Sequence, residues 1–233
     1  MFAKKTVIVT GGAGALGREV VRWFNDRGAQ VGVLDVNDAV LESAFPTVAD
    51  SLYLVSCNLT QRDSCAEAVA KIQERFEQID ILCNVAGGFL MGDPVHETSN
   101  ATWEFLFDLN ARSILNMSAA VVPSMLAAGG GKVINVAARA ALGGAALMGA
   151  YTASKAAVMR LTESMAQELR ANNINVNCVL PSLIDTPRNR QDMPNADYSR
   201  WVTPAQIASV IGFLASPDAV AVHGAGIPVD GLS

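Results

Sequence analysis

Short runs of aliphatic and β-branched residues alternate along this chain with longer segments in which apolar residues recur every three or four positions. The short runs predict buried strands, because a strand of a parallel sheet is covered on both faces and is apolar throughout. The expected strands span residues 6–10, 31–35, 52–56, 81–84, 132–136, 174–180 and 226–229.

The longer segments have the spacing of amphipathic helices. Leu16, Val20 and Phe24, for example, recur at four-residue intervals. Thr203 is expected to cap a further helix, and Pro123 is expected to end or kink another. The expected helices span residues 15–27, 62–76, 102–126, 151–170 and 205–215.

This alternation predicts an α/β fold with a doubly wound, mostly parallel seven-stranded sheet flanked by helices, which is the Rossmann fold. Residues 1–233 are expected to form a single domain. One long irregular segment, residues 181–201, follows the sixth strand at the carboxyl edge of the sheet, where ligands bind. We expect this segment to be a lid over the substrate.

Composition excludes several classes of protein. Hydrophobic residues make up 51% of the chain and charged residues only 17%, which excludes a disordered chain. The formal net charge of −5 lacks the basic surplus of nucleic-acid binders, so no nucleic-acid partner is expected. The most apolar stretch, residues 133–151, carries Asn135 and Arg139, so no membrane span is expected.

The cysteines and histidines do not have the spacing of a metal site or a disulfide framework. The four cysteines form no C-x-x-C pair, and His96 and His223 are the only histidines, so no metal is expected. Unpaired cysteines fit a reducing compartment, and the strand pattern begins too early for a signal peptide. We therefore expect a cytoplasmic protein.

A glycine-rich turn, GGAGALG at residues 11–17, joins the first strand to a helix. A phosphate-binding turn needs this context, because glycines let the backbone approach the ligand and a helix N-terminus attracts anions. The alternative is an ordinary glycine-rich connection. Asp35 ends the second strand, where its carboxylate can accept hydrogen bonds from both ribose hydroxyls and repel a 2′-phosphate. NAD(H) is therefore expected in preference to NADP(H).

Tyr151 and Lys155 lie four residues apart on one face of a predicted helix. A phenol ordinarily has a pKa near ~10, and a neighbouring ammonium group together with an oxidised nicotinamide would lower that pKa toward the working pH. Tyr151 could then exchange a proton with a substrate during hydride transfer. Such pairs occur by chance on many helices, so the interpretation depends on the position of this pair after the fifth strand.

Six motifs occur in the order typical of short-chain dehydrogenases/reductases. They are TGGAGALG, NVAG at residues 84–87, Asn110, YTASK at residues 151–155, VNCVLPSLIDTP and GAGIPVDG. On these motifs, the chain resembles that family over nearly its whole length. The resemblance implies an NAD(P)-dependent oxidoreductase acting on a small molecule, assembled as a homodimer or homotetramer through its two long helices.

The resemblance also assigns roles to single residues. The catalytic residues would be Tyr151, Lys155 and Asn110, the last holding a water in the proton relay. The substrate would be contacted by Phe89, Ala138 and Trp201. The cofactor would be bound by Gly11, Gly14, Ala15, Leu16, Gly17, Asp35, Asn58, Leu59, Asn84, Ala86, Gly87, Tyr151, Lys155, Pro181, Ile184 and Thr186.

The chain departs from the family pattern at several positions. The family's catalytic serine precedes the tyrosine by thirteen residues, and this position is Ala138. Ala15 replaces the middle glycine of the turn, and Asn58 stands where an aspartate commonly contacts adenine. Ser182 replaces the glycine that usually follows Pro181. The chain therefore lacks the usual hydroxyl donor for a substrate oxygen.

These departures resemble the dihydropteridine reductases, a group within the same family. That group also has a G-A-L-G turn and an alanine followed by a basic residue, here Ala138 and Arg139, in place of the serine. The segment from Asp185 to Trp201 is similar as well, whereas Asn110 fits the wider family. A quinonoid dihydropterin spreads charge over a conjugated ring, so it depends less on a single oxyanion donor than a ketone does.

Three functions remain open from the sequence. The first is an NAD(H)-dependent oxidoreductase that acts on a quinonoid dihydropterin. The second is an alcohol or carbonyl oxidoreductase, of the 3-oxoacyl or hydroxysteroid type, that tolerates Ala138. The third is a catalytically silent NAD-binding regulator, which the missing serine favours and the presence of Tyr151 and Lys155 opposes.

Overall fold

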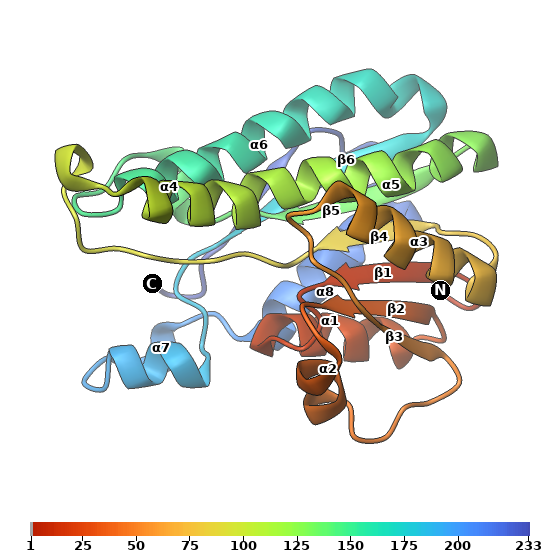
Figure 1. The fold of residues 1–233 in the computed structure, drawn as a ribbon, viewed down its shortest axis with the longest axis horizontal. Coiled ribbons are helices and arrows are strands. Elements are labelled where there is room, and N and C mark those ends of the chain that lie inside the picture. The colour runs from red at the N-terminus through yellow and green to blue at the C-terminus, as the bar shows by residue number, and fades with distance from the viewer. Residues whose placement is uncertain (1) are drawn as a thin grey trace.

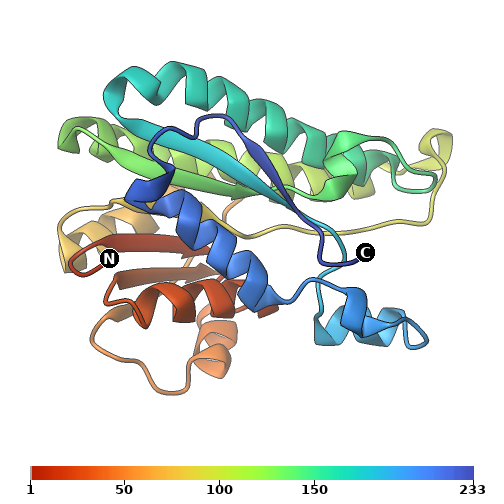
Figure 2. The same ribbon diagram turned by 180° about the vertical axis from the view of Figure 1, so that it is seen from behind.

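A parallel sheet lies between two layers of helices in the computed structural model, which describes residues 2–233 (Figures 1 and 2). Within these residues the sheet has seven strands in the order β3-β2-β1-β4-β5-β6-β7, and every neighbouring pair is parallel. The strands are β1 Thr6–Thr10, β2 Gln30–Asp35, β3 Leu52–Ser56, β4 Ile81–Asn84, β5 Gly131–Val136, β6 Ile174–Pro181 and β7 Gly226–Val229. The predicted doubly wound sheet is confirmed.

Helices cover both faces of the sheet. Buried side chains form one cluster between the sheet and α1, α2 and α8, and a second cluster between the sheet and α3, α5 and α6. The helices are α1 Ala15–Asn25, α2 Asp38–Ala44, α3 Arg62–Phe76, α4 Asn100–Phe107, α5 Ser113–Ala128, α6 Gly149–Leu169, α7 Pro187–Asp192 and α8 Pro204–Ala215. Because both faces are covered, all five residues of β1 are buried, and its sequence is apolar except at its ends.

The order of the strands reverses between β1 and β4. β2 and β3 follow β1 outward on one side, and β4 to β7 continue on the other side. In such sheets the connections at the carboxyl edge diverge at the reversal and leave a crevice for a ligand. The connections that leave β1 and β4 therefore flank the expected site.

A chain of buried hydrogen bonds fastens β4, β5 and α6 to one another. The Asn84 side chain donates to the Asn135 side chain at 2.9 Å, and Asn135 donates in turn to the Thr162 hydroxyl at 2.9 Å. All three residues are buried, and buried amides without partners are costly, so this chain fixes the relative position of the elements it joins. The end of β4 is thereby held against the helix that carries Tyr151.

The predicted helix over residues 102–126 is wrong in two respects. It is two helices, α4 and α5, separated by a π-helical turn over Asp108–Arg112, which places the Asn110 side chain in the interior. Pro123 does not end the second helix, which continues to Ala128. Val121 and Met125 are fully buried on either side of Pro123, so packing compensates for the missing backbone hydrogen bond.

Two short helices were not expected. Helix α2 begins after Asn37, whose side chain accepts a hydrogen bond from the Val40 amide. Helix α7 lies inside the segment 181–201, which the sequence predicts to be irregular. Thr186 and Pro187 supply its N-cap and first residue, so a start signal was present, but six residues give too little helical periodicity to detect.

Candidate functional site

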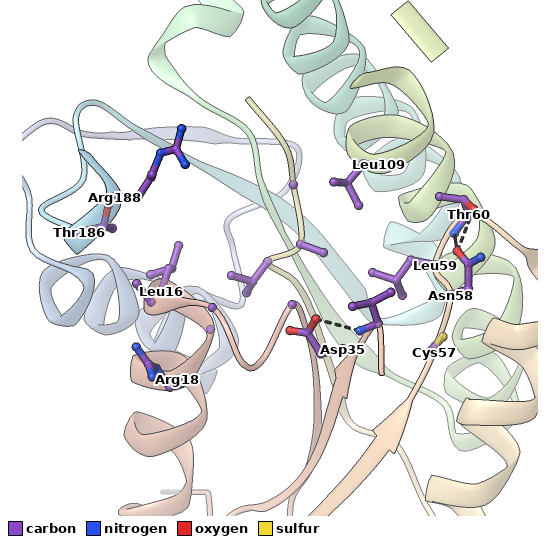
Figure 3. Close-up of a pocket in the computed structure, with 18 of the residues that line it drawn as sticks. Leu16, Arg18, Asp35, Cys57, Asn58, Leu59, Thr60, Leu109, Thr186 and Arg188 are labelled. Atoms are coloured by element: carbon purple, nitrogen blue, oxygen red, sulfur yellow. Dashed lines mark hydrogen bonds between the residues drawn. The ribbon is translucent and has the colours of Figure 1, made fainter. Parts of the chain in front are cut away.

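A cavity of about 990 Å³ opens at the carboxyl edge of the sheet, at the reversal of strand order (Figure 3). This volume lies at the upper end of the usual range for small-molecule sites, roughly 300–1,000 Å³. Its walls come from the glycine turn, the ends of β2 and β3, the loop after β4, helix α4 and the start of α7. The lining residues that the sequence predicted are Gly11, Gly14, Ala15, Leu16, Gly17, Asp35, Asn58, Leu59, Ala86, Gly87 and Thr186.

The glycine turn has the geometry of an anion-binding loop. Gly11 adopts a φ of +63°, which other residues rarely do, and a Cβ on Gly17 would collide with the Gly11 carbonyl oxygen. Helix α1 therefore starts close against the turn, and its N-cap, Gly14, has no side chain to accept the first amide hydrogens. These amides are left for a ligand, so the turn fits a pyrophosphate. Ala15 also lines the cavity, in the place of the family's middle glycine.

Asp35 ends β2 at the floor of the cavity (Figure 3). Its carboxylate accepts hydrogen bonds from the backbone amides of Ala13 at 3.0 Å and Val36 at 2.8 Å. The carboxylate is thereby fixed beside the glycine turn, as a ribose contact requires. A negative charge at this point also opposes a 2′-phosphate.

The segment after β3 forms the opposite wall. The Asn58 side chain accepts hydrogen bonds from the Thr60 amide at 3.1 Å and the Thr60 hydroxyl at 2.8 Å (Figure 3). The Leu59 carbonyl accepts one from the Asn116 side chain at 2.9 Å. Hydrogen bonds within the loop and from Asn116 therefore hold this wall in place. The Asn58 amide oxygen points toward Thr60 of its own loop.

Lys155 is buried where β5, α6 and the loop after β4 meet. Its Nζ donates to the Val136 carbonyl at 3.0 Å, and a Cβ on Gly87 would lie only 2.9 Å from this nitrogen. Burial lowers the pKa of Lys155 to about 8. Gly87 also lines the cavity, so the buried ammonium group stands directly behind the cavity wall.

Tyr151 lies one helical turn before Lys155 on α6, and the Phe89 ring packs edge-on against it with centroids 4.8 Å apart. Burial raises the pKa of Tyr151 to about 12. The lowering of this pKa by a bound oxidised nicotinamide stays a prediction. A phenol with a pKa of about 12 is protonated at neutral pH.

Asn110 ties the loop after β4 to α6. Its Oδ1 accepts from the Gly88 amide at 2.8 Å, and its Nδ2 donates to the Gly88 carbonyl at 3.1 Å and the Ser154 hydroxyl at 2.9 Å. Ser154 in turn donates to the Tyr151 carbonyl at 2.8 Å. Both amide hydrogens are used by protein groups, so only Oδ1 has capacity for the water that the resemblance implies.

Ala138 follows β5 and is buried, and its side chain is a methyl group where the family has a hydroxyl. The next residue, Arg139, forms an ion pair with Asp230, Nε to Oδ1 at 3.2 Å. Ser182 donates to the Asp230 carbonyl at 2.7 Å. A partly exposed ion pair therefore adjoins the buried methyl group of Ala138 in the chain.

The segment 181–201 contributes to the cavity through the start of α7. The Thr186 hydroxyl accepts from the Asn189 amide at 3.2 Å, and both residues line the cavity. An ion pair from Arg190 to Asp185, at 2.6 Å, fastens the helix to the residues before it. Trp201 is buried, with its ring 4.8 Å from that of Tyr198, and packs inside the segment.

Not every predicted residue reaches this cavity. The predicted residues outside its lining are Asn84, Phe89, Asn110, Ala138, Tyr151, Lys155, Pro181, Ile184 and Trp201. Lys155 and Asn110 lie behind the cavity wall at Gly87, and Phe89 packs against Tyr151. The lining residues that the sequence did not indicate are Arg18, Val36, Cys57, Thr60, Phe105, Asp108, Leu109, Pro187, Arg188 and Asn189. Several adjoin predicted residues in the chain. Phe105 comes from α4, and no local motif connects this helix to the cofactor.

Residues 2–233 contain no group of three His, Cys, Asp or Glu side chains placed to hold a metal ion. No helix in the same part of the chain combines the length and apolar character needed to cross a membrane.

Comparison with known proteins identifies the family. Residues 5–197 match the model of the short chain dehydrogenases. The chain belongs to the short-chain dehydrogenase family. This oxidoreductase family uses NAD(P)(H) and acts on small molecules.

Several short-chain dehydrogenases resemble it over nearly their full length. A sorbitol dehydrogenase of Cereibacter sphaeroides is 35% identical, over 90% of this chain and 83% of that protein. An NAD-dependent glycerol dehydrogenase of Listeria innocua serovar 6a is 29% identical, over 97% of this chain and 92% of that protein. The crystal structure of a levodione reductase superposes with a TM-score of 0.91 and 26% identity, over 99% of this chain and 98% of that one.

Lys155 should give this short-chain dehydrogenase a characteristic pH dependence of stability. Its pKa is about 8 in the folded chain and 10.5 ordinarily, so between these values the unfolded chain binds more protons. The free energy of unfolding therefore rises with pH over this window. We expect wild type to gain ~2 kcal/mol relative to Lys155→Met between pH 7.5 and pH 10.

Urea unfolding of both proteins across this pH range measures the difference between their free energies of unfolding. Groups that titrate in the same way in both proteins do not contribute to this difference. Equal pH dependence of the two proteins would show that Lys155 is not desolvated.

Proposed function

We propose that this protein is an NAD(H)-dependent oxidoreductase in which Tyr151 exchanges a proton with a small substrate. When bound, the nicotinamide supplies or accepts the hydride. The observation that carries the proposal is the position of Gly87, which lines the nucleotide-sized cavity and has Lys155 Nζ and Asn110 Oδ1 each 2.9 Å from where its Cβ would lie. The cavity proposed for the cofactor and the groups proposed for proton transfer are therefore separated by a single residue, Gly87.

The preference for NAD(H) rests on Asp35. Its carboxylate is fixed by two backbone amides at the point where a 2′-phosphate would lie, and repulsion there disfavours NADP(H). The Listeria innocua relative is named as NAD-dependent, which agrees with this preference. The turn at residues 11–17 would hold the pyrophosphate, and Lys155 would bind the nicotinamide ribose.

Tyr151 favours the direction of reduction. Its raised pKa keeps the phenol protonated at neutral pH, so it can donate a proton to a substrate atom that receives hydride. The buried ammonium of Lys155 stabilises the phenolate left behind. Asn110 and Ser154 hold the helix that carries both groups against the loop after β4.

The first candidate substrate is a small alcohol or carbonyl compound. The relatives are named for sorbitol, glycerol and levodione, which are of this chemical class. The second candidate is a quinonoid dihydropterin, which the methyl group of Ala138 and the neighbouring Arg139 favour. The segment 181–201 would act as the lid over either substrate, since Thr186 and Arg188 already border the cavity.

We further propose that the protein forms a homodimer or homotetramer through its long helices, α4 and α5 on one side and α6 on the other. Trp103 on α4 and Leu115 on α5 are 47% and 52% exposed, respectively. Exposed large apolar side chains are typical of an interface when they gather in one patch. The four cysteines are free and buried, which fits a cytoplasmic location.

Replacing Tyr151 with Phe should abolish turnover and preserve cofactor binding, since only the phenolic proton is removed. We expect kcat to fall by about 10²–10⁴, the usual contribution of a general acid. The affinity for NADH, measured by fluorescence titration, should stay within about a factor of three of the wild-type value, which is roughly the variation that one altered contact produces. Tyr53→Phe is the matched control and should keep full activity.

Equal turnover by wild type and Tyr151→Phe would contradict the proton-transfer role. Tight NADH binding with no turnover by wild type, on ketones, alcohols or quinonoid dihydropterin, would support the regulator instead.

Ala138→Ser distinguishes the two substrate classes. A restored hydroxyl adds one oxyanion donor, so kcat/KM for ketones should rise, by about tenfold or more. Turnover of quinonoid dihydropterin should not change, because its charge is delocalised. Ala137→Ser is the matched control, since the Ala137 methyl belongs to the core cluster. Fast ketone reduction by wild type, unchanged in Ala138→Ser, would show that the missing hydroxyl has no bearing on substrate choice.

A further inference from the structure

Two thiols meet behind one wall of the cofactor cavity. Cys57 directly follows β3, and Cys65 lies in the first turn of α3. Their sulfur atoms are 3.9 Å apart, and both side chains are buried. No proton transfer or cofactor contact proposed above uses either of them.

The loop between the two cysteines carries the wall of the cavity. Cys57, Asn58, Leu59 and Thr60 line the cavity, whereas Cys65 lies behind them. The Cys65 sulfur approaches the Leu59 carbonyl at 3.7 Å. A change in the distance between the two sulfurs therefore acts directly on residues of the wall.

Cys57 is the thiol of the pair that borders the cavity, whereas Cys65 does not. Contact with the Cys65 thiol lowers the pKa of Cys57, burial opposes this, and the Ser64 hydroxyl lowers the pKa by a smaller amount. The neighbouring sulfur and burial raise the pKa of Cys65. Burial likewise raises the pKa of Cys178, to about 11. The thiolate is the reactive form, and an oxidant that enters the cavity meets Cys57 first.

We propose that Cys57 and Cys65 form an oxidisable dithiol that controls the affinity of the adjoining cavity for NAD(H). Hydrogen peroxide is the class of oxidant that fits, because it is small enough to enter the cavity and reach Cys57. The Cys57 thiolate attacks one peroxide oxygen, the O–O bond breaks, and a sulfenic acid and hydroxide form. The Cys65 thiol then attacks the Cys57 sulfur, water leaves and the disulfide forms, so two thiols and one peroxide give one disulfide and two waters.

The disulfide would move the wall. A disulfide requires a sulfur–sulfur distance of about 2.05 Å, and the present separation is 3.9 Å. The contraction pulls Cys57 and the adjoining Asn58 toward α3, away from the position that the reduced wall holds. If oxidation weakens NADH binding, bound NADH must disfavour the disulfide by the same coupling free energy. NADH in the cavity also covers Cys57, which lines the cavity, and so slows its reaction with peroxide.

The identity of the ligand, NAD(H), rests on the proposed function. The formation of a disulfide between Cys57 and Cys65 does not rest on it. The full-length protein is treated with hydrogen peroxide, with and without saturating NADH, and digested without reduction. Mass spectrometry then reports a peptide pair joined through Cys57 and Cys65 that has lost two hydrogen atoms. NADH affinity is measured by fluorescence before oxidation, after oxidation and after dithiothreitol.

We expect the linked peptide in the free protein, slower linkage with NADH present, and NADH affinity weakened about tenfold and restored by dithiothreitol. Cys65→Ser should bind NADH as reduced wild type does and keep that affinity after peroxide, whereas Cys178→Ala should respond as wild type. Absence of the linked peptide, or linkage without a change in NADH affinity, overturns the proposal. Failure of the reduced protein to bind NADH would instead contradict the proposed function. The linked peptide would still test whether Cys57 and Cys65 form a disulfide.

Discussion

Burial of the Lys155 ammonium group is the constraint on which the arrangement of the site depends. A charged group removed from water must be held by polar partners, and here the Val136 carbonyl at the end of β5 accepts its hydrogen bond. Space for the ammonium exists because Gly87 has no side chain. The end of β5, the loop after β4 and α6 must therefore come together at one point, which lies directly behind the cofactor cavity.

The surrounding hydrogen bonds maintain this convergence. Asn110 links the loop after β4 to α6 through Ser154, and the chain from Asn84 through Asn135 links β4 and β5 to the same helix. The π-helical turn is what lets Asn110 face inward from between α4 and α5. Structural and proposed catalytic roles therefore share the same residues.

The sequence predicts the sheet and the position of the glycine turn well because both depend on local patterns. All seven strands lie within one residue of their predicted bounds, since apolar runs between polar turns define them. The glycine turn and Asp35 were recognisable because each sits at a strand end. The fold class followed from these patterns, whereas the family was indicated by the resemblance of six ordered motifs along the chain.

The remaining features depend on contacts distant in sequence. Nothing local shows that Phe105 borders the cavity or that the Thr102–Leu126 pattern contains a π-helical turn. Burial raises the pKa of Tyr151, and burial is a property of the assembled structure that the local sequence does not show. The Cys57–Cys65 contact also became visible only when the end of β3 was placed against α3.

Transfer of deuterium from NADH tests the central claim, that this chain is a working oxidoreductase although Ala138 replaces the family's serine. NADH labelled at either face of C4 is incubated with the protein and ketones or quinonoid dihydropterin, and each product is examined by mass spectrometry. We expect deuterium in one product from one of the two labelled forms, because a fixed site presents a single face of the nicotinamide. NADH that binds tightly and transfers no deuterium to any substrate would contradict the claim and identify a nucleotide-binding regulator.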